Sequence, residues 1–154
     1  MVAAPPRTAE QRLRDTLDRL AGDVDLWLAS ADPESGMPYL VPLSFLWDGE
    51  AIVFATPAAS RTARNLQAVG RARIGVGPTR DVVMVEGVVE AAEPADSVDA
   101  EFGDAFAAKA EFDPRPLATP YLYFRIRPVR VQAWREANEI AGRDLMRDGK
   151  WLAG

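Results

Sequence analysis

Six segments of the chain have the alternating or extended apolar pattern of β-strands, and two or three others have the spacing of amphipathic helices. Turn residues separate neighbouring strands, most clearly Asp48-Gly49, which is a strong hairpin signal. Short links of this kind join antiparallel strands and favour a closed or nearly closed barrel over a doubly wound parallel sheet. The expected strands are 24–31, 37–47, 50–56, 71–77, 81–91 and 121–134, and the expected helices are 8–21, 60–69 and 95–112.

The two ends of the chain differ in composition from its middle. Residues 1–7 are rich in Pro and Ala, and we expect them to be a disordered tail before a single domain over 8–154. Thr8 can cap the first helix. In the polar C-terminal segment, the expected apolar anchors are Leu145, Met146 and Trp151.

The composition removes several classes of catalytic site. The sequence contains no His and no Cys, which excludes Ser-His-Asp and Cys-His nucleophile systems and removes the usual ligands of zinc and haem. We therefore expect no metal site, and no side chain is singled out as catalytic. Only two lysines occur, Lys109 and Lys150, so few groups titrate near neutral pH. If the protein is an enzyme, a bound cofactor is suited to carry the chemistry.

The charge balance argues against large anionic partners. The net charge is −5 and the arginines are interleaved with Asp and Glu, so we expect no nucleic-acid binding. No apolar run approaches the roughly 18 residues that a membrane span requires. The first residues lack the apolar core of a signal peptide, and cysteine is absent, so a cytoplasmic protein is expected.

One short segment combines cations with the start of a helix. After the third expected strand, Ser60 can cap a helix whose first turns carry Arg61 and Arg64. Leu66 and Val69 are expected to face inward. Acidic residues are usual there, because the helix dipole and the free N–H groups favour negative charge. Arginines at this end are mildly unfavourable unless an anion compensates, and their forked donors suit phosphate. A solvated surface helix with a serine cap is the alternative interpretation.

The order of these motifs resembles the pyridoxamine 5'-phosphate oxidase-like flavin-binding split barrels, and it is most similar to their actinobacterial flavin- and deazaflavin-dependent branch. The resemblance begins with the hairpin at Asp48-Gly49 and the FAT strand end at 54–56. The S-R-x-x-R-N-L helix start at 60–66 and the strand D-V-V-M-V-E-G at 81–87 follow. The segment RIRPVRVQAW at 125–134 is similar to the last barrel strand of the family.

The resemblance implies a mainly β (α+β) fold, a six-stranded antiparallel split β-barrel with Greek-key character and peripheral helices. It also implies a homodimer with two cofactors at the subunit interface and a small-molecule substrate. The cofactor phosphate would lie against the helix start, and its ring along the strand near residue 42, against the end of the FAT strand and against the strand at 82–83. The implied cofactor-binding residues are Ser60, Arg61, Thr62, Arg64, Asn65, Val41, Pro42, Leu43, Ser44, Ala55, Thr56, Val82 and Trp134.

The chain departs from true pyridoxamine phosphate oxidases in its charged residues. Those enzymes carry SRK at the phosphate loop, where this chain has Ser60-Arg61-Thr62. Tyr39 stands where they have a basic residue at the start of the ring strand, and their substrate-binding histidine has no counterpart in a sequence without His. Pyridoxamine phosphate is therefore not the expected substrate, and Arg64 is the candidate replacement for the missing lysine.

Two classes of function remain open. The first is an oxidoreductase in which a bound cofactor exchanges a hydride with a small conjugated substrate, with FMN as the first candidate and the deazaflavin coenzyme F-420 as the alternative. The second is a non-catalytic flavin-binding or carrier protein.

Two pairs of strand residues are expected on outer faces of the barrel. Glu86 and Glu90 are expected on a solvent-exposed face, and Tyr121 and Tyr123 are expected to point outward or toward a dimer interface.

Overall fold

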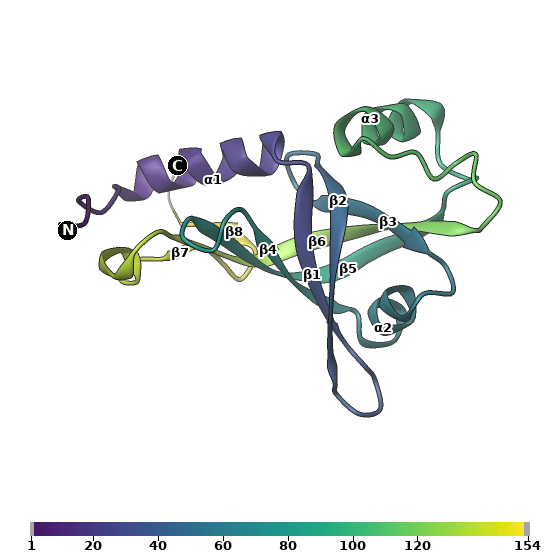
Figure 1. Cartoon of the computed structure of the whole chain (residues 1–154), viewed down its shortest axis with the longest axis horizontal. Helices are drawn as coiled ribbons and strands as arrows, with labels where there is room; N and C mark the ends of the chain where they lie inside the picture. The colour runs from purple at the N-terminus through teal and green to yellow at the C-terminus, as the bar shows by residue number, and fades with distance from the viewer. Residues whose placement is uncertain (1, 153–154) are drawn as a thin grey trace.

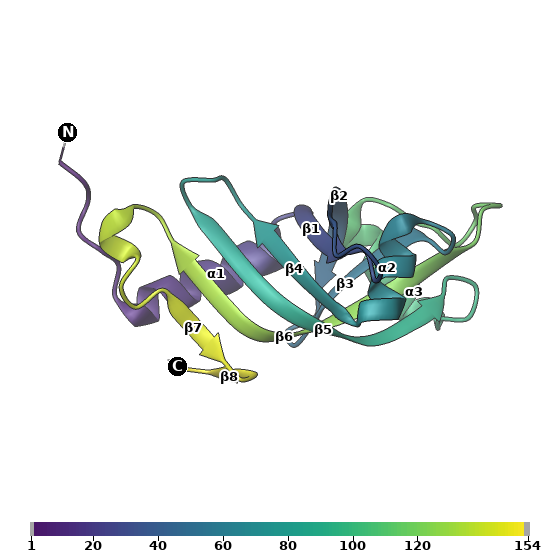
Figure 2. The same ribbon diagram turned by 90° about the horizontal axis from the view of Figure 1, so that it is seen from below.

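The computed structural model describes residues 2–152, and six of its strands form a closed antiparallel barrel (Figures 1 and 2). The strands follow the order β3-β2-β1-β4-β5-β6, and a further pairing between β3 and β6 closes the ring. This closure satisfies the backbone groups at both edges of the sheet. The strands are β1 (Asp25–Ala31), β2 (Pro38–Trp47), β3 (Ile52–Pro57), β4 (Arg71–Val76), β5 (Val82–Pro94) and β6 (Tyr121–Trp134).

Three helices lie around the barrel: α1 (Ala9–Gly22), α2 (Arg61–Val69) and α3 (Ala100–Ala110). Each begins at a side-chain cap that accepts a hydrogen bond from a first-turn N–H group. A short helix η1 (Ala137–Glu139) and a small hairpin, β7 (Asp144–Arg147) with β8 (Lys150–Trp151), follow β6 and continue the sheet at its far end (Figure 2). None of the helices in residues 2–152 is both long and apolar enough to cross a membrane.

The side chains of the strands divide between two apolar clusters. The larger cluster fills the barrel, where Phe54 and Phe124 stack with ring centroids 5.8 Å apart and Leu66 of α2 packs against it. The smaller cluster lies on the outer face of β3 and β6 beneath α3, where Phe106 and Tyr123 meet edge to face at 5.1 Å. Alternation along each strand thus sends successive residues to different cores.

The six expected strands and the split-barrel fold are confirmed, with two shifts of boundary. β5 continues to Pro94, and α3 begins only after Asp99, whose carboxylate accepts a hydrogen bond from the N–H of Phe102 at 2.8 Å. Asp48 closes the β2–β3 hairpin by accepting from the N–H groups of Glu50 and Ala51.

Two details of the expected packing are wrong. Val69, expected inside, is 36% exposed at the end of α2. Trp151, expected as an anchor, is likewise exposed, because β8 is the outermost strand of the sheet. Leu145 and Met146 are buried as expected.

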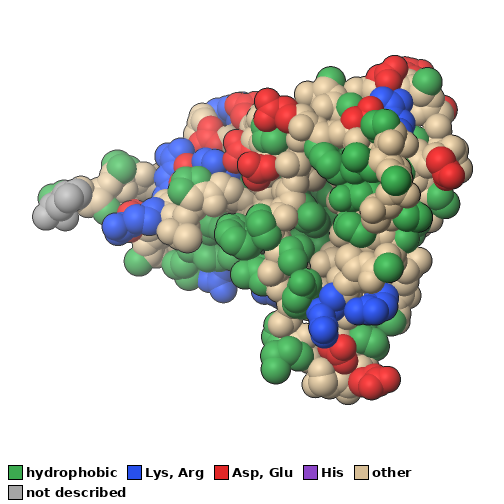
Figure 3. All heavy atoms as spheres, turned by 45° about the vertical axis from the view of Figure 1, so that its right-hand side comes forward, with side chains coloured by type: hydrophobic (Ala, Val, Ile, Leu, Met, Phe, Trp, Pro, Cys, Tyr) green, Lys and Arg blue, Asp and Glu red, His purple; other side chains and the backbone are tan. Residues whose placement is uncertain are grey.

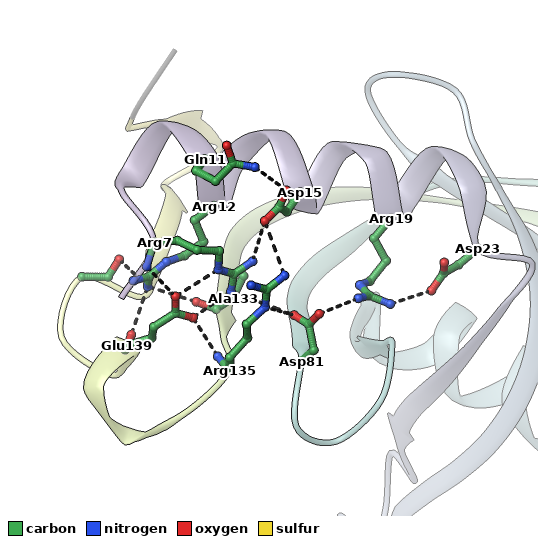
Figure 4. A network of polar contacts seen from close by, with 11 residues as sticks. Arg7, Gln11, Arg12, Asp15, Arg19, Asp23, Asp81, Ala133, Arg135 and Glu139 are labelled. Carbon is green, nitrogen blue, oxygen red and sulfur yellow. Dashed lines mark hydrogen bonds and ion pairs between the residues drawn. The ribbon is translucent and has the colours of Figure 1, made fainter. Parts of the chain in front are cut away.

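The N-terminal segment is attached to the C-terminal part of the chain (Figure 4). Arg7, in the segment expected to be a tail, donates its backbone N–H and its guanidinium to the carboxylate of Glu139. The carbonyl of Ala4 accepts a hydrogen bond from Asn138 at 2.8 Å. Residue 1 of that tail and residues 153–154 of the domain lie outside the described residues.

Candidate functional site

The start of α2 combines a serine cap with free backbone N–H groups. Ser60 is extended (φ −68°, ψ 158°), and its hydroxyl accepts a hydrogen bond from the N–H of Ala63 at 3.1 Å. Thr56 at the end of β3 lies against it, with the two hydroxyl oxygens 3.1 Å apart. The first-turn N–H groups of Arg61 and Thr62 have no intrahelical partner, as at any helix start. They and the helix dipole therefore favour an anion at this end.

Two arginines at this helix start are exposed and unpaired. Within residues 2–152 no carboxylate lies within 4.0 Å of the guanidinium of Arg61 or Arg64. The guanidinium of Arg61 lies over the ring of Tyr39, 5.5 Å from its centroid. Tyr39, on β2, thus faces an arginine of α2. Figure 3 shows basic side chains gathered beside the protruding β1–β2 hairpin.

The other polar residues of α2 hold the helix in place. Thr62 is 3% exposed and Asn65 is 2% exposed, so both face the protein interior. The Asn65 amide donates to the hydroxyl of Ser30 on β1 at 3.1 Å. These two of the expected cofactor contacts therefore fix the orientation of α2 against the barrel, and their side chains are not presented to the surface that Arg61 and Arg64 share.

The expected ring strand presents alternate residues to two sides. Val41 and Leu43 are partly buried and pack against the barrel core. Pro42 and Ser44 face outward, where they pair across the strand with Trp27 and Asp25 of β1. The Ser44 hydroxyl donates to the Asp25 carboxylate at 2.8 Å. These outward residues line a cavity of about 610 Å³.

The remaining expected contacts lie elsewhere in the protomer. Ala55 packs in the cluster beneath α3. Val82 pairs with Trp134 at one end of β6, whereas Thr56 pairs with Leu122 at the other end. Trp134 is twelve positions after Leu122 along β6, which corresponds to roughly 35–40 Å of strand at about 3.3 Å per residue. One ring-shaped ligand cannot touch both groups within one chain.

Several other expectations can be compared with the structure. Glu86 and Glu90 lie on the outer face as expected, where they pair with Arg73 and Arg125. Tyr123 points outward from the barrel as expected, but it is only 3% exposed because it lies beneath α3, and burial raises the pKa of its phenol. The alternation of residues along β6 places Tyr123 on the outer face of the barrel, but it does not predict that α3 covers that face.

Tyr121 and Trp134 are both partly buried at the ends of β6. Tyr121 packs against Phe112, with ring centroids 5.6 Å apart. Trp134 lies beside the guanidinium of Arg143, which is 5.9 Å from its ring centroid. Neither residue is a fully exposed aromatic that would by itself mark an interface.

Sequence reasoning missed the outward residues of β1. Asp25 and Trp27 lie directly opposite Ser44 and Pro42, so they share the wall of the cavity. Their alternation with Leu26 and Leu28 was the signal, because it places them on the face opposite the core. The described residues contain no group of three or more acidic residues placed to hold a metal ion.

The family comparison agrees with this fold and helix start. Residues 19–135 match the family described as Pyridoxamine 5'-phosphate oxidase. The chain belongs to that family. The match covers the barrel from the end of α1 to the end of β6, and thus includes α2 with its two unpaired arginines. A comparison with curated protein sequences gives no match.

Solved structures with the same fold include proteins with three different named ligands. An F-420 reductase is 22% identical, with a TM-score of 0.62 over 74% of this chain and 93% of that chain. A FAD-binding protein from Mesorhizobium loti is 19% identical, with a TM-score of 0.58 over 77% and 89% of the two chains. A pyridoxamine 5'-phosphate oxidase-related, FMN-binding protein from Nostoc punctiforme is 18% identical, with a TM-score of 0.51 over 81% and 78%.

Proposed function

We propose that the protein is an oxidoreductase that binds the phosphate of FMN at the start of α2. The observation that carries this proposal is the pair of unpaired guanidinium groups, on Arg61 and Arg64, beside free helix N–H groups. This donor set fits a phosphate dianion, since each element supplies hydrogen bonds or positive charge at one place. Family membership supports the same assignment.

The chain's own residues would bind the cofactor and exclude water. Bound FMN would supply hydride transfer to an electron-poor double bond, with a reduced nicotinamide nucleotide as the two-electron donor and water as the source of the one proton that completes the reduction. Arg61 and Arg64 hold the phosphate, and Pro42 with Trp27 offers apolar surface for a planar ring. No histidine is required for these tasks, in agreement with the composition.

The proposed working unit is a homodimer with a cofactor site at each side of the interface. The dimer is proposed because Val82 and Trp134 lie far from α2 in the same protomer. In a dimer, Val82 and Trp134 of one protomer can lie beside the α2 helix start of the other. The β1–β2 hairpin also projects from the barrel (Figure 1) and exposes Trp27, Met37 and Leu40 at 53%, 67% and 60%. Covering this strip is a function suited to a second copy.

Two alternatives share the same anion site. The deazaflavin coenzyme F-420 also bears a phosphate, and an F-420 reductase is among the structures with this fold. A carrier that binds a flavin without turnover would need the same helix start, because none of the described groups is uniquely catalytic. The cytoplasm remains the expected location for each of these functions.

Reconstitution distinguishes the alternatives. The purified protein is titrated with FMN and with the deazaflavin coenzyme, while cofactor fluorescence reports binding and light scattering reports mass. The proposal expects one FMN per chain, a dimer at micromolar concentration, and oxidation of pre-reduced FMN by a neutral quinone in a single turnover. Binding without turnover supports the carrier, preference for the deazaflavin supports the second cofactor, and no binding of either refutes the anion site.

A further inference from the structure

The β1–β2 ribbon contacts the first two turns of α2 through two pairs of residues. Ser30 on β1 and Tyr39 on β2 lie directly opposite each other in the ribbon, so their side chains share one face of it. Arg61 and Asn65 are four residues apart on α2 and share a face of that helix. The Asn65 amide donates to the Ser30 hydroxyl at 3.1 Å. The Arg61 guanidinium lies over the Tyr39 ring, 5.5 Å from its centroid.

The two contacts differ in exposure. Ser30 is 6% exposed and Asn65 is 2% exposed, so the hydrogen bond between them belongs to the protein interior. Tyr39 is 38% exposed, and Arg61 is exposed as well. Holding an exposed arginine in one place costs conformational entropy, and the attraction of the cation to the aromatic face offsets part of that cost. Tyr39 therefore restricts a side chain that would otherwise move freely in solvent.

The contact with Tyr39 leaves Arg61 able to donate hydrogen bonds. An aromatic ring approaches a guanidinium from one side, so the N–H groups on its other sides remain available. No carboxylate of residues 2–152 lies within 4.0 Å of this guanidinium. An ion pair would also order the arginine, but it would occupy its donors and cancel its charge. An aromatic partner orders Arg61 and keeps it suited to phosphate.

One carboxylate of the β1–β2 hairpin loop lies within electrostatic range of Arg61. The pKa of Asp32 is lowered, chiefly by hydrogen bonds from the backbone N–H groups of Ser35 and Glu34 and to a smaller extent by the charge of Arg61. The Asp32 Oδ1 atom accepts those two N–H groups at 2.8 and 2.9 Å. The loop backbone therefore holds this carboxylate in the turn, beyond ion-pair distance of Arg61, and the ring of Tyr39 remains the contact of the guanidinium.

Arg64 provides an internal comparison for Arg61. It is exposed on the same helix, three residues further along. Arg61 has an aromatic partner in Tyr39, whereas no aromatic ring of residues 2–152 lies against the guanidinium of Arg64. The two arginines share the helix start and the lack of a carboxylate partner, so a difference in their mobility can be assigned to the aromatic contact.

We propose that Tyr39 is a positioning residue for the cofactor phosphate: its ring holds the guanidinium of Arg61 beside the free N–H groups of α2 before the cofactor binds. The inference rests on the proposed function, since it concerns the same phosphate. A group that is already ordered in the ligand-free protein loses less entropy on binding, and the affinity is correspondingly higher. Tyr39 thus acts on ligands that carry the phosphate, and it acts through Arg61.

The first test compares FMN with riboflavin, which has the same ring system and no phosphate. Both are titrated by flavin fluorescence into the full-length parent and its variants. Tyr39→Leu should weaken FMN binding about three- to tenfold and change riboflavin binding much less. Tyr39→Phe keeps the ring and should stay within about twofold of the parent. In an Arg61→Ala background, Tyr39→Leu should have no further effect on FMN affinity, because the residue through which it acts is gone.

The second test needs no cofactor. Nuclear magnetic relaxation of the arginine Nε–H groups reports the mobility of each guanidinium in the ligand-free protein. Arg61 should be more ordered than Arg64 in the parent and in Tyr39→Phe, and Tyr39→Leu should make the two equally mobile. Thermal unfolding followed by circular dichroism verifies that each variant is folded.

Three results overturn the inference. The first is an equal loss of FMN and riboflavin affinity in Tyr39→Leu, which would assign Tyr39 a structural role only. The second is a loss of FMN affinity that persists in the Arg61→Ala background, and the third is an Arg61 guanidinium as mobile in the parent as in Tyr39→Leu. A parent that binds FMN no more tightly than riboflavin overturns the proposed phosphate site as well, so the two failures are distinguishable.

Discussion

Two groups of arginines in this protein have opposite surroundings. Beside α1, each arginine of the first group has a carboxylate partner. Ion pairs join Arg7, Arg19 and Arg135 to Asp15, Asp81 and Glu139 in one continuous network (Figure 4). At the start of α2, Arg61 and Arg64 have no carboxylate partner within residues 2–152. The ion-paired group stabilises the fold, and the unpaired group is available to bind an anion.

The burial of the two groups differs in the same sense. Arg12, on α1, is 4% exposed, and its guanidinium donates to the carbonyl oxygens of Ala133, Glu139 and Gly142. Arg61 and Arg64 are exposed. A buried charge needs hydrogen-bond partners in the folded protein, and Arg12 has three at one nitrogen although its Nε has none within residues 2–152. A solvated charge without a partner costs little. Substitutions in the two groups should therefore change different measured quantities.

The largest expected effect is on cofactor affinity. Arg61→Ala combined with Arg64→Ala removes two charge-assisted hydrogen bonds to phosphate, each worth about 1.5–3 kcal/mol. FMN affinity should fall by about 3 kcal/mol or more, measured by fluorescence titration, while the free energy of unfolding without ligand barely changes. Arg71→Ala, an exposed arginine just beyond α2, is the control. Equal FMN affinity in parent and double variant would show that these arginines do not bind the phosphate.

The next effect is on stability. Arg7→Met leaves Glu139, whose side chain is 3% exposed, without its ion-pair partner. Breaking a buried pair in this way costs about 3–5 kcal/mol, which urea denaturation would measure as a lower free energy of unfolding. Arg14→Met, on the exposed side of α1, should change the free energy by much less. If the two variants were equally stable, the network of Figure 4 would not be stabilising.

The network also predicts a dependence of stability on pH. The Arg7 guanidinium holds the pKa of Glu139 at about 2, below its ordinary value of 4.5, and Arg147 and Gln132 hold the pKa of Asp144 at about 2. A carboxyl whose pKa is lower in the folded state stabilises the fold above its unfolded pKa. Stability should therefore be level above about pH 5 and fall as the pH drops toward 2. Arg7→Met should make this decline shallower in acid titrations followed by circular dichroism.

The smallest expected effect concerns Ser60, which caps α2 and also lies at the proposed phosphate site. Ser60→Ala removes the hydroxyl that accepts the N–H of Ala63, and loss of such a cap costs about 1 kcal/mol. Thermal unfolding should show this modest loss, and FMN affinity should fall less than in the double arginine variant. Ser60→Asp is the sharper comparison: it keeps a cap acceptor but places a negative charge beside the phosphate, so it should restore stability and weaken FMN binding.

Local signals in the sequence predicted much of the fold. Thr8 and Ser60 cap the helices that they were expected to begin, and the turn at Asp48-Gly49 joins β2 to β3. Caps and tight turns depend on neighbouring residues only, so they can be recognised without the tertiary structure. The pairing of β3 with β6 and the β7–β8 hairpin depend on distant contacts, and no residue pattern in those segments specifies them.

The candidate site was predicted less completely than the fold. The helix start and its arginines follow from local chemistry, but the direction of each ring-strand residue depends on which face the core occupies. Val41 and Leu43 therefore point inward although they share a strand with Pro42 and Ser44. Thr56 and Val82 are far apart because they pair with opposite ends of β6. The alternation of residues along a single strand does not predict this distance, which depends on how the strands pair.

Two contacts attach the N-terminal segment to η1, and they matter for engineering. Asn138 donates a hydrogen bond to the carbonyl of Ala4, and Arg7 donates to the carboxylate of Glu139. Shortened versions of the chain should retain Arg7, because cutting beyond it would remove the ion pair of Glu139 and leave Arg12 to hold η1 against α1.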